Sequence, residues 1–356
     1  MKWNHHIPLI CELKPISGYF VPETSLSELL SPKERFIARI PNKGYRNLAY
    51  VLNAFITNAT QTIIDTGGAS RTFYPRKAID APNTSLYLGS NCMMSPYSLN
   101  VGSSTSPHDV TRYELYSRYF SVGAHGIGYV VPESDKTKIV TYHRYAFAPP
   151  SKAVGEAGLY MRFASNNYYL AYVYHYHALL ARAIIDPVVE KIANVEYEEG
   201  WEIVFPANYT KWFVDAVQLS EMTGEGALGP LVMDATGAYR IARYANMWAG
   251  SPDVMIGSDN SPPSPTDYHL KAPIASLSSQ THAVEIDTTL QECRIVRTGT
   301  YTPAATTVLG EVALYTNIYD DTGTARKIMI ARGIWDPPVT LEAGVTYTIG
   351  IALRLG

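Results

Sequence analysis

Two histidines have the spacing that comes closest to a metal site in this chain. One residue separates His175 from His177, so in a β-strand both imidazoles lie on one face, and His143 is the nearest candidate for a third ligand. The alternative is that these histidines are polar strand residues beside tyrosines. Because a pair of histidines without a third ligand is not a metal site, we predict no bound metal and no other cofactor.

Three glutamates, Glu196, Glu198 and Glu199, form the second candidate, because paired carboxylates can carry out general acid–base catalysis. The alternation of a strand leaves only Glu196 and Glu198 on one face, and a solvated turn is the interpretation that we favour for this segment. The chain has no G-x-S-x-G segment, phosphate-binding loop, H-E-x-x-H or Cys-x-x-Cys. We therefore expect no catalytic residue, no small-molecule substrate and no enzymatic activity.

An aspartate followed six residues later by an arginine occurs as Asp65 with Arg71 and again as Asp234 with Arg240. A catalytic pair would also need a base and a pocket motif, so we interpret both pairs as structural salt bridges or turn caps. The two pairs lie 169 residues apart, which is the first sign of an internal repeat.

Four more pairs of similar segments follow in the same order, and the distance between partners falls steadily from 169 to 144 residues. Chance similarity would scatter these distances, so the pattern predicts a duplicated unit. The matched pairs are 63–71 with 232–240, 86–90 with 254–258, 155–160 with 310–315, 181–187 with 331–337, and 199–201 with 343–345.

The repeat divides the chain into three parts. We predict an N-terminal arm over residues 1–44, a first copy over 45–206 that carries an insertion at 91–155, and a second copy over 207–356. Surface loops tolerate such an insertion, so we expect residues 91–155 to project from the first copy.

The elements of each copy can be read from the periodicity of apolar residues. Helical spacing predicts a helix over 48–56 and a shorter counterpart over 212–219. Runs of apolar and β-branched residues at 311–319, 325–332 and 346–353, with turn residues between them, predict strands. Many short strands of this kind are typical of β-sandwiches. The predicted fold is therefore all-β with short helices: two tandem, internally duplicated β-sandwich domains plus an extended N-terminal arm.

The arm contains five prolines in residues 1–44, a composition that argues against a long helix or a central strand. So short a segment cannot bury its own apolar residues. We predict that Trp3, Ile7, Tyr19 and Phe20 take part in assembly, with a partner subunit ordering the arm. The alternative is that the arm packs on its own first copy and caps an exposed edge strand.

Composition narrows the classes of partner. A net charge of −3 with 17% charged residues argues against a nucleic-acid partner, and no apolar stretch has the length of a membrane span or a signal peptide. We therefore expect no membrane partner and synthesis in the cytoplasm. The 27 tyrosines on a chain of low charge favour a protein whose surface is covered by copies of itself. The alternative is that tyrosine is abundant only because it is common in the strands of such sandwiches.

We expect no chemical modification of the cysteines or the sequons. The thiols of Cys11, Cys92 and Cys293 should be reduced, and the sequons at Asn58, Asn83 and Asn208 should not be glycosylated.

Segments of the second copy resemble a domain of virion structural proteins of tailed bacteriophages and archaeal viruses. They are D-A-T-G-A-Y-R at 234–240, I-G-S…P-P-S-P-T-D-Y-H-L at 256–270, G-E-V-A-L-Y at 310–315 and I-A-R-G-I-W-D-P-P-V-T-L-E-A-G-V-T-Y-T-I at 330–349. In those proteins the last run closes an immunoglobulin-like or jelly-roll-like sandwich. The resemblance implies a virion protein (capsid, decoration or tail) whose partners are copies of itself and other virion proteins.

Two other functions remain open at this point. A subunit of an extracellular filament or appendage would need strand donation by the arm and an export route. A carbohydrate-binding tail component would need exposed tryptophan and tyrosine in one groove, beside paired acids.

Overall fold

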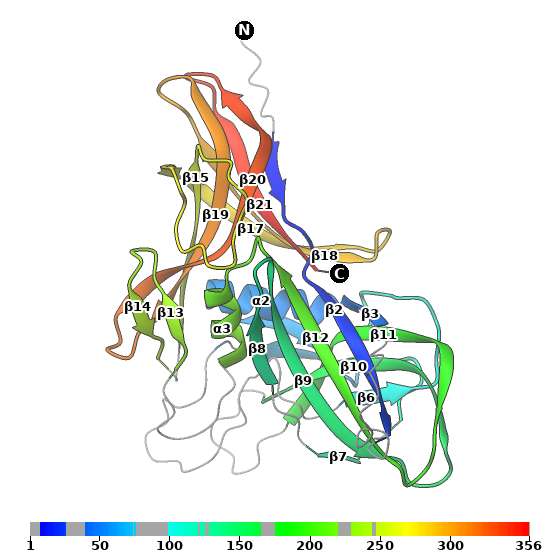
Figure 1. Cartoon of the computed structure of the whole chain (residues 1–356). Helices are drawn as coiled ribbons and strands as arrows, with labels where there is room; N and C mark the ends of the chain where they lie inside the picture. The colour runs from blue at the N-terminus through cyan, green and yellow to red at the C-terminus, as the bar shows by residue number, and fades with distance from the viewer. Residues whose placement is uncertain are drawn as a thin grey trace.

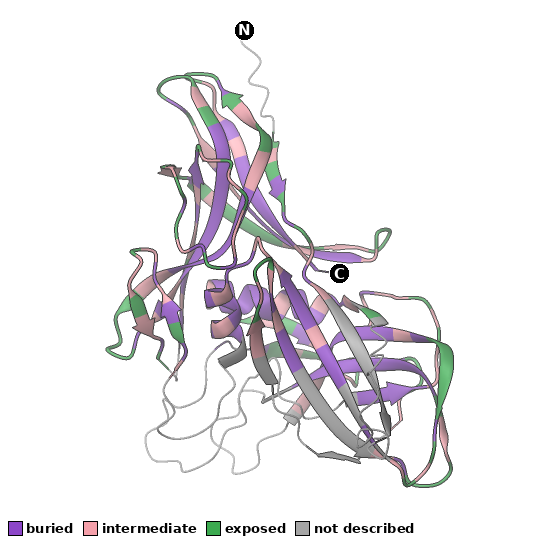
Figure 2. Cartoon of the chain, in the orientation of Figure 1, coloured by how far each residue is buried: buried purple, intermediate pink, exposed green. Residues whose placement is uncertain are grey.

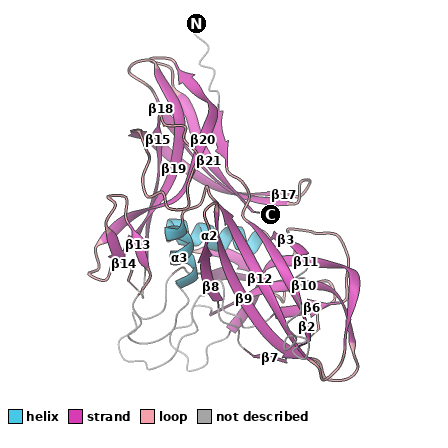
Figure 3. Ribbon diagram, viewed as in Figure 1, coloured by secondary structure: helices cyan, strands magenta, loops and turns pink. Residues whose placement is uncertain are grey.

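The protein is represented by a computed structural model, which describes residues 8–25, 40–73, 75, 99–119, 122–124, 128–164, 175–219, 229–243 and 247–355. The described chain is mostly strand with two helices, which confirms an all-β fold with short helices (Figure 3). The elements are β1 (Pro8–Glu12), β2 (Ser17–Ser25), β3 (Ile40–Gly44), α2 (Arg46–Thr57), β4 (Gln61–Ile64), β5 (Ser70–Phe73), β6 (Leu99–Gly102), β7 (Val122–Ala124), β8 (Gly128–Pro132), β9 (Lys136–Ala146), β10 (Lys152–Ala164), β11 (His175–Lys191), β12 (Glu196–Pro206), α3 (Lys211–Leu219), β13 (Leu231–Met233), β14 (Tyr239–Ile241), β15 (Trp248–Gly257), β16 (Pro273–Ser276), β17 (Ser278–Asp287), β18 (Glu292–Tyr301), β19 (Thr307–Tyr319), β20 (Ala325–Leu341) and β21 (Tyr347–Leu355).

Most elements of the second half of the chain repeat those of the first in the same order, as the labels in Figure 1 allow the reader to follow. α2, the hairpin β4–β5 and strands β6, β8, β9, β10, β11 and β12 correspond to α3, the hairpin β13–β14 and strands β15, β17, β18, β19, β20 and β21. β9 pairs with β8 and β12 as β18 pairs with β17 and β21, and β10 pairs with β6 and β11 as β19 pairs with β15 and β20. The topology thus agrees with a duplication, while the exact domain boundaries stay predictions.

Glycines at two corresponding positions fix the register of the copies. Gly102 of β6 pairs with Glu156 of β10, and Gly257 of β15 pairs with Glu311 of β19. A Cβ atom at Gly102 or Gly257 would lie 2.5 or 2.4 Å from the carboxylate oxygen of the paired glutamate. Only glycine leaves room for the carboxylate at these positions, so Gly102 corresponds to Gly257.

This register corrects one sequence match. Residues 254–258 of the second copy correspond to residues 99–103 of the first, which are β6 and the residue after it. The sequence match of 254–258 with residues 86–90 is therefore wrong. The segment 91–155 is therefore not an insertion, because its strands β6, β8 and β9 have counterparts in the second copy. The extra length of the first copy instead precedes β6 and separates β10 from β11, mostly outside the described residues.

A second match shifts in the same way. Asn194 and Gly344 both have positive φ, at 60° and 73°. Tyr197 and Tyr347 each accept a hydrogen bond from the backbone N–H five residues earlier, at 2.7 and 2.9 Å. Asn194 therefore corresponds to Gly344, and the sequence match of residues 199–201 with 343–345 is wrong. The two positions look different in sequence because asparagine tolerates the left-handed conformation that glycine adopts.

The arm changes the sheet architecture. The second copy contains two four-stranded sheets, β16-β15-β19-β20 and β1-β21-β18-β17. In the first copy, β2 and β3 lie between β11 and β12 and join the corresponding strands into one nine-stranded sheet. The prediction of two self-contained sandwich domains is therefore wrong. Edge strands expose unpaired N–H and C=O groups, and arm strands satisfy them in both copies.

All described strands of the arm pair within their own chain, but not as an edge cap of the first copy: β1 pairs with the second copy, and β2 and β3 lie between strands of the first. β1 runs parallel to β21, and β2 runs antiparallel to β12. The prediction that prolines exclude a central strand is wrong for β2. Only Gly18–Phe20 of β2 pairs with β3, and Pro22 lies beyond that stretch, so its missing N–H costs no hydrogen bond to β3.

Both predicted helices are confirmed, as α2 and α3. α2 ends at Asn58, which has the left-handed conformation that commonly ends helices. Neither described helix has the length and apolarity needed to cross a membrane. The apolar stripe that predicted α2 is buried in full: Leu48, Val51, Leu52, Phe55 and Ile56.

Each helix packs on the other copy as well as on its own. α2 contacts β15, β17 and β18 of the second copy, and α3 contacts β8 and β9 of the first. Phe55 of α2 stacks on Trp248 with ring centroids 5.3 Å apart, and Phe213 of α3 meets the same ring edge-on at 6.2 Å. Both helices therefore lie at a buried junction (Figure 2), and the two copies share one continuous core.

Candidate functional site

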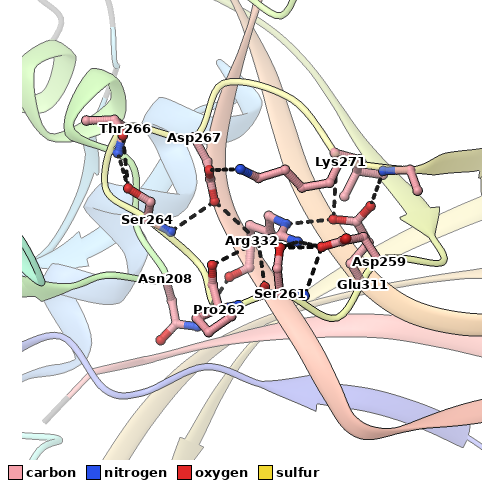
Figure 4. A network of polar contacts seen from close by, with 12 residues as sticks. Asn208, Asp259, Ser261, Pro262, Ser264, Thr266, Asp267, Lys271, Glu311 and Arg332 are labelled. Atoms are coloured by element: carbon pink, nitrogen blue, oxygen red, sulfur yellow. Dashed lines mark hydrogen bonds and ion pairs between the residues drawn. The ribbon is translucent and has the colours of Figure 1, made fainter.

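Arg332 of β20 is the centre of a buried polar network in the second copy (Figure 4). Its Nε donates to Glu311 of β19 at 2.6 Å, and both side chains are at most 1% exposed. Nη2 donates to Asp259 at 2.8 Å, and Nη1 lies 3.4 Å from Asp267. Three carboxylates thus compensate one buried guanidinium, which satisfies the requirement of a charge removed from water.

The network anchors the proline-rich loop between β15 and β16. Arg332 Nη1 donates to the carbonyl oxygen of Ser261 at 3.0 Å. The Glu311 carboxylate accepts the backbone N–H groups of Lys271 and Ala272 at 3.2 and 2.8 Å. One ion pair therefore fixes the loop to the long hairpin β19–β20 and satisfies backbone groups that have no strand partner.

The first copy repeats this arrangement around Arg182. Its Nε lies 2.7 Å from Glu156, with both side chains fully buried, and its Nη1 donates to the carbonyl oxygen of Ser106 at 2.8 Å. The Glu156 carboxylate accepts the N–H of Ser117 at 2.8 Å. Nη2 donates to the carbonyl oxygen of Ser104 at 3.4 Å, and no described carboxylate pairs with it where the second copy has an aspartate. The glutamate–arginine pair is common to both copies, and the added aspartates belong to the second alone.

Sequence reasoning did not single out these pairs. Glu156 and Arg182 both lie inside matched segments, as do Glu311 and Arg332. A charged residue that recurs inside two apolar strand runs is the available signal, since such a charge must be paired when buried. The carboxylates of Glu156 and Glu311 already accept hydrogen bonds from a guanidinium and from backbone N–H groups. The arrangement is therefore suited to holding loops rather than to acid–base catalysis.

The repeated aspartates are turn caps, as predicted. Oδ2 of Asp65 and Asp234 accepts the Nε of the arginine six residues later at 2.7 and 2.8 Å, while Oδ1 accepts backbone N–H groups of the turn. A third such turn, missed from sequence, joins β19 to β20, where Arg326 donates to Asp320 at 2.7 Å. The glycine three residues after each aspartate has φ near 80°, which explains the spacing D-x-x-G-x-x-R.

We expect the Asp234 turn to lose stability in acid. Burial raises the pKa of this carboxyl, but hydrogen bonds from Thr236, Arg240 and the backbone outweigh burial and hold the pKa below its usual range. Because the folded-state pKa is depressed, the contribution is present above the unfolded value of about 3.9 and is lost as the pH falls through the folded pKa. Urea denaturation measures the free energy of unfolding at pH 6 and pH 3. Between these pH values, D234N should lose less of this free energy than the wild type. The control D135N changes an exposed aspartate and should lose as much unfolding free energy as the wild type. If D234N also loses as much as the wild type, the prediction is contradicted.

The structure does not bring the three candidate metal ligands together. His175 and His177 lie in β11, while His143 lies in β9, and β3, β2 and β12 stand between these strands. Four interstrand spacings amount to about 19 Å. Among the residues that the structure describes, no group of three or more histidine, cysteine, aspartate or glutamate side chains is placed to hold a metal ion.

The three candidate glutamates belong to a strand. Glu196, Glu198 and Glu199 begin β12 and pair with Ala146, Arg144 and His143 of β9. The predicted solvated turn is therefore wrong at this place. The turn lies a few residues earlier, around Asn194, whose positive φ marks it.

Cys11 and Cys293 are buried free thiols, and burial raises their pKa to about 11 and about 12, so both are protonated at neutral pH. The side-chain amide of Asn208 donates to the carbonyl oxygen of Arg332 at 3.2 Å, so this sequon asparagine has a structural role. Two of the residues considered above, Cys92 and Asn83, lie outside the described residues.

The four predicted assembly residues are only partly placed. Trp3 and Ile7 lie outside the described residues. Tyr19 and Phe20 lie in β2, where they pair with Glu202 and Trp201 of β12. Their assignment to assembly stays a prediction.

A stronger candidate for an assembly surface lies on the hairpin β13–β14. Leu231 and Tyr239 are 55% and 59% exposed. The strand register puts the half-buried Met233 and Ile241 on the same face of this hairpin, where Tyr239 also meets the ring of Trp212 edge-on. We call these four residues the outer hairpin face. The corresponding residues of the first copy, in hairpin β4–β5, are Thr62, Ile64, Ser70 and Thr72.

The same backbone therefore carries an apolar outward face in one copy and a largely polar one in the other. The hairpin fold does not require exposed apolar side chains, since β4–β5 forms without them. Comparisons with protein-family models, with curated proteins and with solved structures gave no match to this chain.

Proposed function

We propose that the chain is a structural subunit of a viral particle, a capsid, decoration or tail component, that assembles with copies of itself and with other particle proteins. The observation that carries this proposal is the arm, whose strands complete sheets of both copies. The resemblance of the second copy to virion proteins supplies the class of assembly.

Strand addition by the arm relies on the backbone. β1 pairs with β21 over five residues from Pro8 to Glu12, and the following residues Leu13 and Ile16 are buried at 2% and 3% exposure. Main-chain pairing accepts the same strand from the same chain or from a neighbour. An arm of this kind lets one sequence serve both a free subunit and an assembled one.

The outer hairpin face supplies a second contact of the right chemistry. Large apolar side chains exposed together mark interaction surfaces more often than isolated ones do. The aromatic Tyr239 beside Leu231 has the composition of an interface core. A second copy of the chain is the occupant that self-assembly implies.

Electron microscopy of the purified protein at its native size tests the proposal. Closed shells, rings or tubes built from the chain, or its decoration of such particles, support a particle subunit. A protein that stays a monodisperse monomer at all concentrations and binds no particle protein contradicts it.

The double variant L231T/I241T is expected to weaken self-association without changing the fold. It gives the outer hairpin face the threonines found at the corresponding positions 62 and 72 of the first copy. Exposed substitutions of this kind change stability by only about 0.5 kcal/mol. Sedimentation velocity over a concentration series measures association, and S70T in the first copy is the control. Unchanged association of L231T/I241T refutes a role for this face.

One alternative is favoured by a specific observation. The addition of β1 to the edge of β21 is also the kind of pairing by which an arm donates a strand in an extracellular filament. The same microscopy separates the two functions, because a filament grows without closing. For the carbohydrate-binding alternative, Trp201, Trp212 and Trp248 are not available as stacking surfaces, because each is at most 4% exposed.

A further inference from the structure

Arg297 of β18 differs from the other deeply buried arginines of the described chain. It is 4% exposed, and its Nε and Nη2 have no hydrogen-bond partner among the described residues. Arg182 and Arg332 are buried as deeply, and each pairs with a glutamate. A guanidinium removed from water without a counter-charge is unfavourable, so its donors would be satisfied by an anion.

The neighbouring strands contribute no acid to Arg297. Ile351 of β21 lies opposite it on one side and His282 of β17 on the other. β17 is the last strand of this sheet, and no described strand pairs with its other edge. His282 is mostly exposed. The burial of part of its ring and, to a smaller extent, the charge of Arg297 lower its pKa. Arg297 is thus one strand inward from an open edge.

The elements packed against β18 also leave Arg297 unpaired. Asp253 of β15 is already held by Lys327, Gln280 and Ser276 at 2.8, 2.9 and 3.0 Å. Helix α2 and strand β3 also contact β18, and neither contains an acid. Arg46 of α2 likewise has a buried Nε without a partner among the described residues. Burial lowers the pKa of Arg297 to about 10, so the guanidinium remains charged at neutral pH.

The fold does not require this charge. The strand register makes Thr141 the counterpart of Arg297 and Gly128 the counterpart of His282 in the first copy. A sheet of the same topology therefore forms with a small polar residue and a glycine at these places. The charge is a property of the second copy alone.

We propose that Arg297, with His282 beside it, binds a carboxylate that enters at the β17 edge. Nε and Nη2 are the two donors that hold a carboxylate side-on with two parallel hydrogen bonds. Arg354 on the neighbouring strand β21 shows this geometry, with Nε and Nη2 donating to the two oxygens of Glu292 at 2.6 and 2.7 Å. The carboxylate is either a free small acid or an acidic group of a second copy.

Thermal melting in sodium formate against sodium chloride at equal ionic strength tests the free acid. Formate should raise the melting temperature of the wild type by about 2–3 °C at saturation and leave that of R297M unchanged. R294M is the matched control, because Arg294 lies on the same strand with its side chain already paired with Glu12 and Glu285. R294M should respond to formate as the wild type does.

Sedimentation of the wild type and R297M over a concentration series tests the second copy as the source. Self-association that R297M abolishes and that formate suppresses supports the proposal with the acid on a neighbouring chain. If formate acts equally on the wild type and R297M, and R297M associates as the wild type does, the proposal is overturned. The proposed function survives that result, because it does not depend on Arg297.

Discussion

The variant E156A is expected to lose about 3–5 kcal/mol of unfolding free energy, the usual cost of removing one partner from a buried ion pair. Arg182 would lose its carboxylate partner and keep uncharged ones such as the carbonyl oxygen of Ser106, and the N–H of Ser117 would lose its acceptor. Urea or guanidinium denaturation followed by circular dichroism measures the loss.

The second copy provides the matched comparison. E311A should cost less than E156A, because Arg332 retains Asp259 and Asp267. R71Q, which removes the partly exposed Arg71 from its pair with Asp65, should cost less than E156A, because Asp65 keeps its hydrogen bonds from the backbone of the turn. The double variant E156M/R182M should recover part of the loss, since an apolar pair removes the uncompensated charge. Equal losses in E156A and R71Q would show that the buried pair has no special role.

Deleting residues 2–16 is expected to lower the melting temperature of the isolated subunit substantially. The deletion removes β1 and the buried side chains of Cys11, Leu13 and Ile16. Gly333 of β20 lies directly under this segment, since a Cβ there would be 2.5 Å from the Cys11 sulfur. Each buried side chain of leucine size contributes about 2–5 kcal/mol, so the whole segment contributes on the order of 5 kcal/mol.

Two readouts separate the roles of the arm. Calorimetry of dilute monomer reports the contribution within the chain, and size-exclusion chromatography reports assembly. A deletion of residues 2–7 alone is the control for the end of the arm. Loss of assembly with an unchanged melting temperature would mean that a neighbour, and not the same chain, supplies the surface under β1.

The duplication and both helices could be predicted from the sequence because their signals are local. The D-x-x-G-x-x-R turn is written in consecutive residues, and the stripe from Leu48 to Ile56 belongs to one helix. The misplaced insertion has a different origin. Residues 86–90 and 99–103 both end in glycine and serine after apolar residues, and only the contact of Gly102 with Glu156 decides between them. That contact joins residues far apart in sequence.

The role of the arm in the sheets was beyond sequence reasoning for the same reason. The prolines of the arm show where backbone N–H groups are missing. They do not show which strands lie on the two sides of β2. Arg297 shows a further limit: its type was visible in the sequence, but the lack of a counter-charge depends on Ile351 and His282, which lie opposite it on the neighbouring strands. Composition and periodicity carry no information on such neighbours.

The pairing of β1 with β21 has a consequence for synthesis on the ribosome. β1 contains Pro8 and its partner strand ends at Leu355, so nearly the whole chain must be translated before these strands can meet. At about 5–20 residues per second, β1 waits roughly 17–70 s for its partner strand. α2 waits as well, because the β15 surface under Phe55 is translated about 190 residues later. While the rest of the chain is being synthesised, the first copy therefore exposes apolar surfaces that the second copy later covers, and such surfaces are prone to aggregation.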